Sequence, residues 1–276
     1  MIDQQHLKDM KPFKYKKRLS NIYLKYWKKE KLDKYFLPIN KKISYEPYFP
    51  VTKQTTIQFP PEIKDLVNLH KLIRKRKVFT VLEFGIGFSS IVIADALLKN
   101  KNDFERLRDK PKIRKNNTFE IHSVDANRFW INKIKKQFPV KLKNSFHVHY
   151  SQLEMSKIDG RICHLFKDLP NVIPDFIYVD GPATHDVKGK INGVSFSNIE
   201  RTVMNGDLLT IEPYFTPGTY ILIDGRTNTA RFLKNNFQRN YKYKHNFRND
   251  THSFELKEPP LGIYNKRILQ YCGLLK

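Results

Sequence analysis

The sequence contains very little cysteine and no long apolar run, and each shortage excludes a class of protein. Its 276 residues include two cysteines, which stand too far apart to suggest a disulfide scaffold or a cysteine zinc site. We therefore expect a reducing, cytoplasmic setting. The most apolar stretch, residues 78–98, contains Glu83 and Asp95, so it does not predict a membrane span. Residues 1–17 are rich in lysine and lack an apolar core, so we expect no signal peptide.

Acidic residues are also scarce relative to basic ones. The chain has 27 aspartates and glutamates against 51 lysines and arginines, a formal net charge of +24. Such a charge can attract nucleic acid, a membrane surface or an acidic sugar. The lysines are scattered along most of the chain, however, and no zinc knuckle, RNP-like aromatic strand or helix-turn-helix accompanies them. A general compositional bias therefore explains the charge better, and nucleic acid stays a second candidate partner.

The composition divides the chain near residue 60. Within residues 1–44, aromatic residues and leucines recur among the lysines at spacings near three and four, which predicts one or two amphipathic helices that end at Pro38. The prolines of residues 45–61 indicate an irregular linker. We expect a basic helical extension and linker over residues 1–60 and one domain over residues 61–276. Three roles for the extension stay open: packing on the domain, capping the site, or meeting an acidic partner.

From residue 61 onward, short apolar segments alternate with amphipathic ones. This alternation predicts an α/β fold, a doubly wound and mostly parallel seven-stranded sheet with an antiparallel hairpin at its C-terminal end. We expect strands at residues 78–83, 118–124, 145–150, 175–179, 220–223, 241–247 and 253–256, and helices at 61–73, 89–98, 128–137 and 228–236. A charged insertion occupies residues 99–117, which we expect to form a helix tail and an exposed loop.

A glycine loop follows the first expected strand and opens the next helix. It contains Glu83, Gly85, Gly87 and Ser89 at alternate positions. Glycines suit a loop whose backbone must lie close to a ligand, and a helix N-terminus offers free N–H groups. A carboxylate here would repel the pyrophosphate of a dinucleotide, whereas it favours a ligand with an ammonium group. Ser89 or its neighbour Ser90 can cap the helix.

Two further strands also end in aspartate. Asp125 closes the second strand and precedes Ala126, and such a carboxylate can accept hydrogen bonds from the hydroxyls of a ribose. Asp180 closes the apolar strand at residues 175–179, and His185 follows in a polar loop. Open α/β sheets bind their ligands at this carboxyl edge, so we expect these side chains to share one site.

These motifs resemble those of the class I S-adenosylmethionine-dependent methyltransferases, which have a Rossmann-like fold. The resemblance covers residues 78–257, about two-thirds of the chain. It implies that S-adenosylmethionine is the cofactor and that its ligands include Glu83, Gly85, Gly87, Ser89, Asp125, Ala126, Ser151, Gln152 and Asp180. The chain departs from the family in the wide spacing between Glu83 and Asp125, which the insertion at residues 99–117 explains.

The resemblance points to O-methylation of a small molecule or sugar. An alcohol needs a base, and Asp180 or His185 is the candidate. Asp180 and Asp224 with a histidine could hold a divalent cation, but no acidic pair follows the fifth strand as in the magnesium-dependent relatives, so a metal is not favoured. Arg226 could clamp an acidic substrate. Two alternatives stay open: an RNA methyltransferase that uses the basic surface, and a non-catalytic binding protein of the same fold.

Overall fold

A seven-stranded sheet forms the centre of the computed structural model, which describes residues 21–36, 62–196, 201–202 and 204–275. The strand order is β3-β2-β1-β6-β8-β10-β9. These strands are β1 (Thr80–Phe84), β2 (Glu120–Asp125), β3 (Phe146–Tyr150), β6 (Phe176–Val179), β8 (Tyr220–Asp224), β9 (Tyr241–Asn246) and β10 (Thr251–Leu256). Only β10 runs antiparallel to its neighbours, so the sequence-based prediction of the sheet is confirmed.

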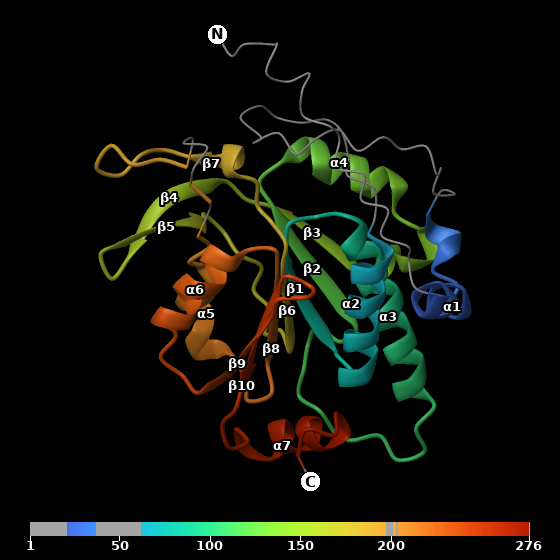
Figure 1. Cartoon of the computed structure of the whole chain (residues 1–276). Coiled ribbons are helices and arrows are strands. Elements are labelled where there is room, and N and C mark those ends of the chain that lie inside the picture. Colours follow the sequence, from blue (N-terminus) through green and yellow to red (C-terminus); the bar gives the residue numbers. More distant parts are fainter. Residues whose placement is uncertain (1–20, 37–61, 197–200, 203, 276) are drawn as a thin grey trace.

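Helices cover both faces of this sheet (Figure 1). They are α1 (Asn21–Lys29), α2 (Ile63–Arg76), α3 (Phe88–Glu105), α4 (Arg128–Gln137), α5 (Asp207–Ile211), α6 (Thr227–Asn236) and α7 (Gly262–Tyr271), with short 3-10 turns η1 (Asp33–Tyr35), η2 (Val140–Ser145), η3 (Thr184–Asp186) and η4 (Glu212–Tyr214). One apolar cluster packs α2 and α3 against the sheet, and another packs α5 and α6 on the opposite face. Because the central strands are covered on both sides, every residue of β1 and β6 is buried.

The prediction missed a second, three-stranded sheet. Its order is β5-β4-β7, formed by β4 (Leu153–Ile158), β5 (Arg161–Phe166) and β7 (Val187–Lys188). The turn between β4 and β5 is Asp159-Gly160, with φ of 47° and 77°. Two positive φ values in a two-residue loop are typical of the tight hairpin turn that Asp-Gly favours. That dipeptide was the available signal for the hairpin.

The N-terminal extension packs on the domain through α1. Trp27 and Leu32 are buried against Leu66 and Val67 of α2 and Val92 of α3. The predictions for residues 1–20 and 37–61, including the linker and Pro38, lie outside the described residues.

A buried polar network reinforces this contact. The Tyr26 hydroxyl lies 2.7 Å from His70 Nδ1, and His70 Nε2 lies 3.1 Å from the Asp95 carboxylate. The Tyr35 hydroxyl donates to the other oxygen of Asp95 at 2.7 Å, and Lys99 joins Asp95 to Glu30. Every buried polar group of the contact therefore has a partner, which fixes how α1 sits on the domain.

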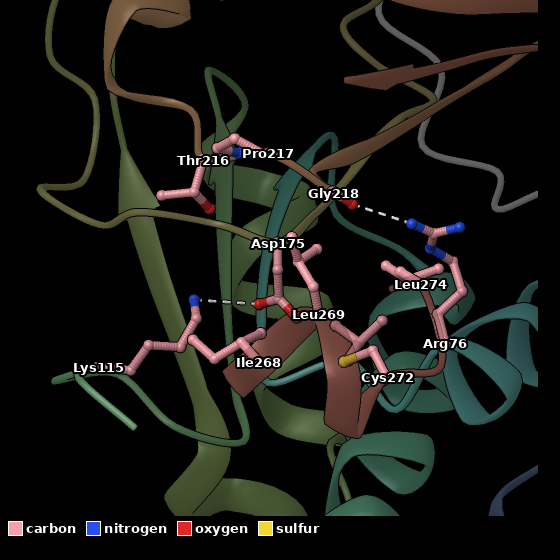
Figure 2. Close-up of a pocket in the computed structure, with 11 residues that line it drawn as sticks. Arg76, Lys115, Asp175, Thr216, Pro217, Gly218, Ile268, Leu269, Cys272 and Leu274 are labelled. Carbon is pink, nitrogen blue, oxygen red and sulfur yellow. Dashed lines mark hydrogen bonds and ion pairs between the residues drawn. The ribbon is translucent and has the colours of Figure 1, made fainter. Parts of the chain in front are cut away.

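The last helix, α7, closes the amino-terminal end of the sheet. Figure 2 shows a cavity of about 20 Å³ between α7 and the start of β6, with the Lys115–Asp175 ion pair at 3.1 Å on its wall. Arg76 donates to the Gly218 carbonyl oxygen at 2.9 Å on the other side. A cavity of that size holds about one water molecule. The cavity is thus too small to hold a ligand larger than water. Across the described residues, no helix has both the length and the apolar character needed to cross a membrane.

Trp27→Ala should destabilise the whole domain by about 3–5 kcal/mol, because the buried indole joins α1 to α2 and α3. Ile22→Ala on the same helix is the matched control, since Ile22 is 68% exposed and its loss should change stability by less than about 0.5 kcal/mol. Chemical denaturation of both variants measures the difference. An unchanged unfolding midpoint for Trp27→Ala would show that the extension does not contribute to the stability of the domain.

Candidate functional site

Four carboxyl groups lie at the carboxyl edge of the large sheet. The register pairs Glu83 of β1 with Ser123 of β2 and with Tyr178 of β6, so these strands end level with one another. Asp125 and Asp224 are the last residues of β2 and β8, and Asp180 follows β6 directly. The structure therefore places Glu83, Asp125, Asp180 and Asp224 along one edge, as the sequence predicted.

Glu83 is fully enclosed by hydroxyl groups. Its carboxylate accepts from Ser89 at 2.6 Å, Ser90 at 2.5 Å and Ser123 at 2.5 Å, and the residue is 0% exposed. Burial raises the pKa of Glu83 to about 7, against the opposing effect of these three hydroxyls. The side chain thus fixes the loop and the first turn of α3, and it presents no exposed surface to a ligand.

The helix cap differs from the prediction. Gly87 is the N-cap of α3, with extended backbone at φ −171°, and Ser89 and Ser90 lie inside the first turn. Ser90 Oγ accepts from the Gly87 N–H at 3.2 Å while donating to Glu83. Ser90 therefore takes part in the cap from the third helical position, as the N3 residue of a capping box does, whereas the Ser89 hydroxyl donates to Glu83 instead.

Two glycines from different loops touch at this edge. A Cβ on Gly181 would lie 2.6 Å from Gly85 Cα, and Gly85 itself has φ +95°. The Gly85 N–H donates to the Val124 carbonyl oxygen, and the Gly181 N–H donates to the Phe84 carbonyl oxygen. These hydrogen bonds hold the two backbones so close together that neither position has room for a side chain. The close approach explains why both positions are glycine.

Asp125 organises the neighbouring end of β2. Its carboxylate accepts the backbone N–H of Ile86 at 3.0 Å and that of Asn127 at 2.7 Å, and burial raises its pKa to about 6. It is 8% exposed, and Ala126 beside it is half-buried. Each carboxylate oxygen has a second lone pair, so Asp125 can still accept from a ligand.

The segment after β3 lies beside Asp125. The Ser151 N–H donates to the Asp125 carbonyl oxygen at 3.1 Å, and Ser151 Oγ accepts from the Asp168 N–H at 2.8 Å. Ser151 is buried, whereas Gln152 is exposed. The structure thus brings both predicted residues to the edge, with the side chain of Ser151 committed to the protein and that of Gln152 open to solvent.

Asp180 and Asp224 form the other half of the edge. Asp224 accepts from the buried Tyr178 hydroxyl at 2.8 Å. Asp180 is exposed to solvent, yet the protein around it and the nearby Asp224 carboxylate raise its pKa to about 7. Arg226 does not reach outward for a substrate, because its guanidinium donates to the carbonyl oxygens of Pro182 and Asp180. The contact with these carbonyls was missed from sequence, since it requires knowing that the two loops meet.

His185 lies on the half of the edge that contains Asp125. It belongs to η3, where Asp186 accepts from Asn127 Nδ2 at 3.3 Å, and the next residues form β7 beside β4. The His185 ring is 16% exposed, lies 3.6 Å from Asp186 and has no hydrogen-bond partner on either nitrogen among the described residues. The chain therefore crosses from β6 toward β4, and the η3 turn that contains His185 lies beside Asn127 at the end of β2.

A cavity of about 300 Å³ adjoins Asp224, and apolar atoms form the larger part of its surface. It lies between α2 and the strands β8, β9 and β10, and its polar lining includes Asp65, Asn68, Lys244, Asn246, Asn249, Thr251 and Ser253. Tyr178 and Tyr220 add aromatic surface. The volume is at the lower end of the range for small-molecule pockets. Amide, hydroxyl and carboxyl groups beside aromatic rings suit a polyhydroxylated ligand.

No protein-family model matches the chain, and no curated protein sequence matches it. Among solved structures, it is similar to an SAH-bound methyltransferase from Podospora anserina, with 11% identity and a TM-score of 0.42 over 87% of this chain and 89% of that one. It is also similar to the O-methyltransferase TomG from Streptomyces achromogenes in complex with SAM, with 13% identity and a TM-score of 0.37 over 72% and 82% of the two chains.

An O-methyltransferase from Bacillus cereus in complex with SAH is similar as well, with 11% identity and a TM-score of 0.36 over 92% of this chain and 96% of that one. At these identities and scores the likenesses carry no argument about activity. The strand order and the antiparallel β10 establish the fold directly, and it is the fold that the resemblance in sequence implied.

Gly181→Ala should destabilise the protein by about 2 kcal/mol or more, because the new methyl group would force the two loop backbones apart. Gly87→Ala is the control in the same loop region. A Cβ there meets nothing closer than Ser89 Oγ at 3.9 Å, so we expect less than about 1 kcal/mol. Thermal unfolding of the two variants measures this difference. Equal effects would contradict the close approach of Gly85 and Gly181.

Proposed function

We propose that this chain is an S-adenosylmethionine-dependent methyltransferase that transfers the methyl group to an oxygen of a small molecule or sugar. The observation that carries the proposal is the row of four carboxyl groups at the carboxyl edge, three of them with pKa values raised to about 6 or 7. Burial also raises the pKa of the fourth, Asp224. The chain as a whole has a net charge of +24, but the carboxyl groups at this edge favour a cationic ligand there.

A cationic ligand distinguishes the proposed cofactor from a dinucleotide. S-adenosylmethionine has a sulfonium and an ammonium group and no phosphate, and it supplies the activated methyl group of the reaction. A pyrophosphate would meet the exposed Asp180 at the same edge, which like-charge repulsion opposes. The acidic edge therefore fits the sulfonium donor.

We propose which residues bind S-adenosylmethionine from their positions along the carboxyl edge. Gly87 leaves the loop backbone open to close approach, and Gly85, which packs against Gly181, is proposed to contact the donor through its backbone. Asp125 and Ala126 are proposed to bind the ribose hydroxyls. Ser151 and Gln152 border the same place and are proposed to lie near adenine. Glu83 and Ser89 act through the loop, because their side chains bond to each other.

The acceptor is proposed to occupy the cavity beside Asp224. Its lining of amides, hydroxyls and carboxyls can satisfy the several hydroxyl groups of a sugar. A volume of about 300 Å³ suits a small acceptor better than an RNA strand. An RNA acceptor and a non-catalytic role are the outcomes that the experiments below would reveal.

Asp180 is the proposed base. Its carboxyl is exposed, lies between the donor residues and the cavity, and has a pKa of about 7 that suits proton removal near neutral pH. His185 lies on the half of the edge that contains Asp125, so we propose that it contacts the methyl donor. It is the alternative base if Asp180 does not remove the proton. Both cysteines are free thiols, in keeping with the cytoplasmic setting that we propose.

Affinity for S-adenosylmethionine should fall about tenfold between pH 8 and pH 6. A carboxyl with a pKa near 7 loses about nine-tenths of its negative charge over that interval, and with it the attraction for a cation. Isothermal titration calorimetry at the two pH values measures the change. Asp109→Asn, which removes an exposed acid far from the edge, is the control and should behave as the wild type. No heat of binding at either pH would leave only a non-catalytic scaffold.

Asp180→Asn should lower turnover at least about a hundredfold while S-adenosylmethionine affinity falls by less than about tenfold. His185→Ala should instead raise KM for the donor more than it lowers kcat. Release of S-adenosylhomocysteine in the presence of a panel of sugars, phenols and tRNA provides the assay. Wild-type turnover in both variants would overturn the assigned roles, and salt-sensitive turnover on tRNA alone would favour the RNA alternative.

A further inference from the structure

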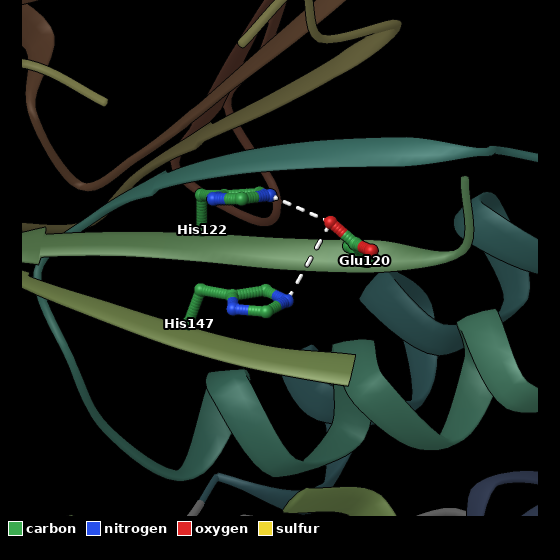
Figure 3. Close-up of side chains that lie close together, drawn as sticks. All are labelled: Glu120, His122 and His147. Carbon is green, nitrogen blue, oxygen red and sulfur yellow. Dashed lines mark hydrogen bonds and ion pairs between the residues drawn. The ribbon is translucent and has the colours of Figure 1, made fainter. Parts of the chain in front are cut away.

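A second cluster of potential ligands lies in the amino-terminal half of β2 and β3, away from the carboxyl edge. Glu120 and His122 stand two positions apart on β2, and His147 is the register partner of His122 on β3. Alternate residues of a strand share a face, so all three side chains lie on one face of the sheet. Figure 3 shows both imidazole rings with a nitrogen directed toward the Glu120 carboxylate.

The distances within the cluster match those of a coordinated ion. His122 Nε2 lies 3.2 Å and His147 Nε2 lies 3.5 Å from Glu120 Oε2, and all three atoms lie within 4.8 Å of one another. Ligands bound tetrahedrally at about 2.0–2.1 Å from zinc are separated by about 3.3–3.4 Å. Small rotations of the side chains would therefore bring the three atoms onto one ion.

The hydrogen bonds around the cluster leave a place for that ion. His147 Nε2 is buried and has no hydrogen-bond partner among the described residues. His122 Nδ1 lies 3.2 Å from His149 Nε2. This contact holds the Nδ1 edge of the His122 ring while Nε2 points to Glu120. Asn117 Nδ2 donates to the same Glu120 oxygen at 3.1 Å and holds the carboxylate. Such outer contacts are what orient the ligands of a metal.

A second group of metal-binding residue types, His245, Asp250 and His252 on β9 and β10, is less suitable. Both nitrogens of His252 are already engaged, Nε2 with Thr227 at 3.0 Å and Nδ1 with Tyr243 at 2.8 Å. An ion there would have to displace a contact to a group outside the ligand set, whereas an ion at Glu120 would replace only the contact between Glu120 and His122 Nε2, which are both proposed ligands. This group therefore serves as an internal control.

We propose that Glu120, His122 and His147 bind one divalent transition-metal ion, with zinc as the first choice. Two imidazoles and a carboxylate are a common zinc ligand set, and three protein ligands leave the fourth position to water. Glu120 and Asp125 are the two ends of β2, about 16 Å apart at 3.3 Å per residue, so the ion is separate from the methyl-transfer site. By bridging β2 and β3, it would fasten the edge strand of the sheet to its neighbour.

Zinc titration of the full-length, EDTA-treated protein tests the proposal by calorimetry and thermal unfolding. We expect one ion per chain and a rise in Tm, because a ligand that binds only the native state stabilises it. His147→Ala and Glu120→Gln should each weaken zinc binding by at least about tenfold and abolish the Tm rise. His147 is 41% exposed and Glu120→Gln keeps its shape, so both variants should fold. Cobalt, added in place of zinc, should give the intense visible absorption of a tetrahedral site.

His245→Ala is the matched control, and it should bind zinc as the wild type does. The proposal is overturned if the folded wild type takes up no zinc at micromolar concentration, or if His147→Ala and Glu120→Gln bind zinc as tightly as the wild type. It is equally overturned if His245→Ala, and not His147→Ala, loses the ion. Neither result depends on S-adenosylmethionine binding, so the methyltransferase proposal stands or fails separately.

Discussion

The buried carboxylate of Glu83 is the interaction on which the proposed site depends. It joins β1 to the first turn of α3 and to β2, because Ser89, Ser90 and Ser123 all donate to it. A buried carboxyl without these partners would cost several kcal/mol. Satisfying it requires the glycine loop to turn sharply between β1 and α3. The loop then brings Gly85 against Gly181, and the ends of β1 and β6 become one surface.

That surface has the opposite charge preference from the rest of the chain. Lysines give the molecule its net charge, whereas the carboxyl edge gathers Asp125, Asp180 and Asp224 around the loop. Crowding by protein and by other carboxyls raises their pKa values, and a cation at the edge would relieve that repulsion. The basic composition and the acidic site are therefore compatible. The first concerns the whole surface, and the second concerns one edge of the sheet.

Local patterns predicted the large sheet well. Both faces of β1 and β6 are covered, so every position of these two strands is buried. The bounds of α4 were predicted correctly to the residue. The second sheet was missed because β4 and β5 are half-exposed and weakly apolar, so only the Asp-Gly turn between them signalled a hairpin. The helix α3 runs to Glu105, so the helix tail that was expected at the start of the charged insertion is confirmed.

The sequence by itself determined the fold class and the order of the acidic residues along the edge, because strand ends and glycine loops are local features. Only the tertiary structure decided what those residues touch. Ser123 is 40 positions from Glu83, and its hydroxyl reaches the carboxylate because β1 and β2 are in register. Arg226 looked free to bind a substrate, yet it bonds to the loop after β6. Contacts between residues far apart in the chain depend on the register and packing of strands, which no local pattern specifies.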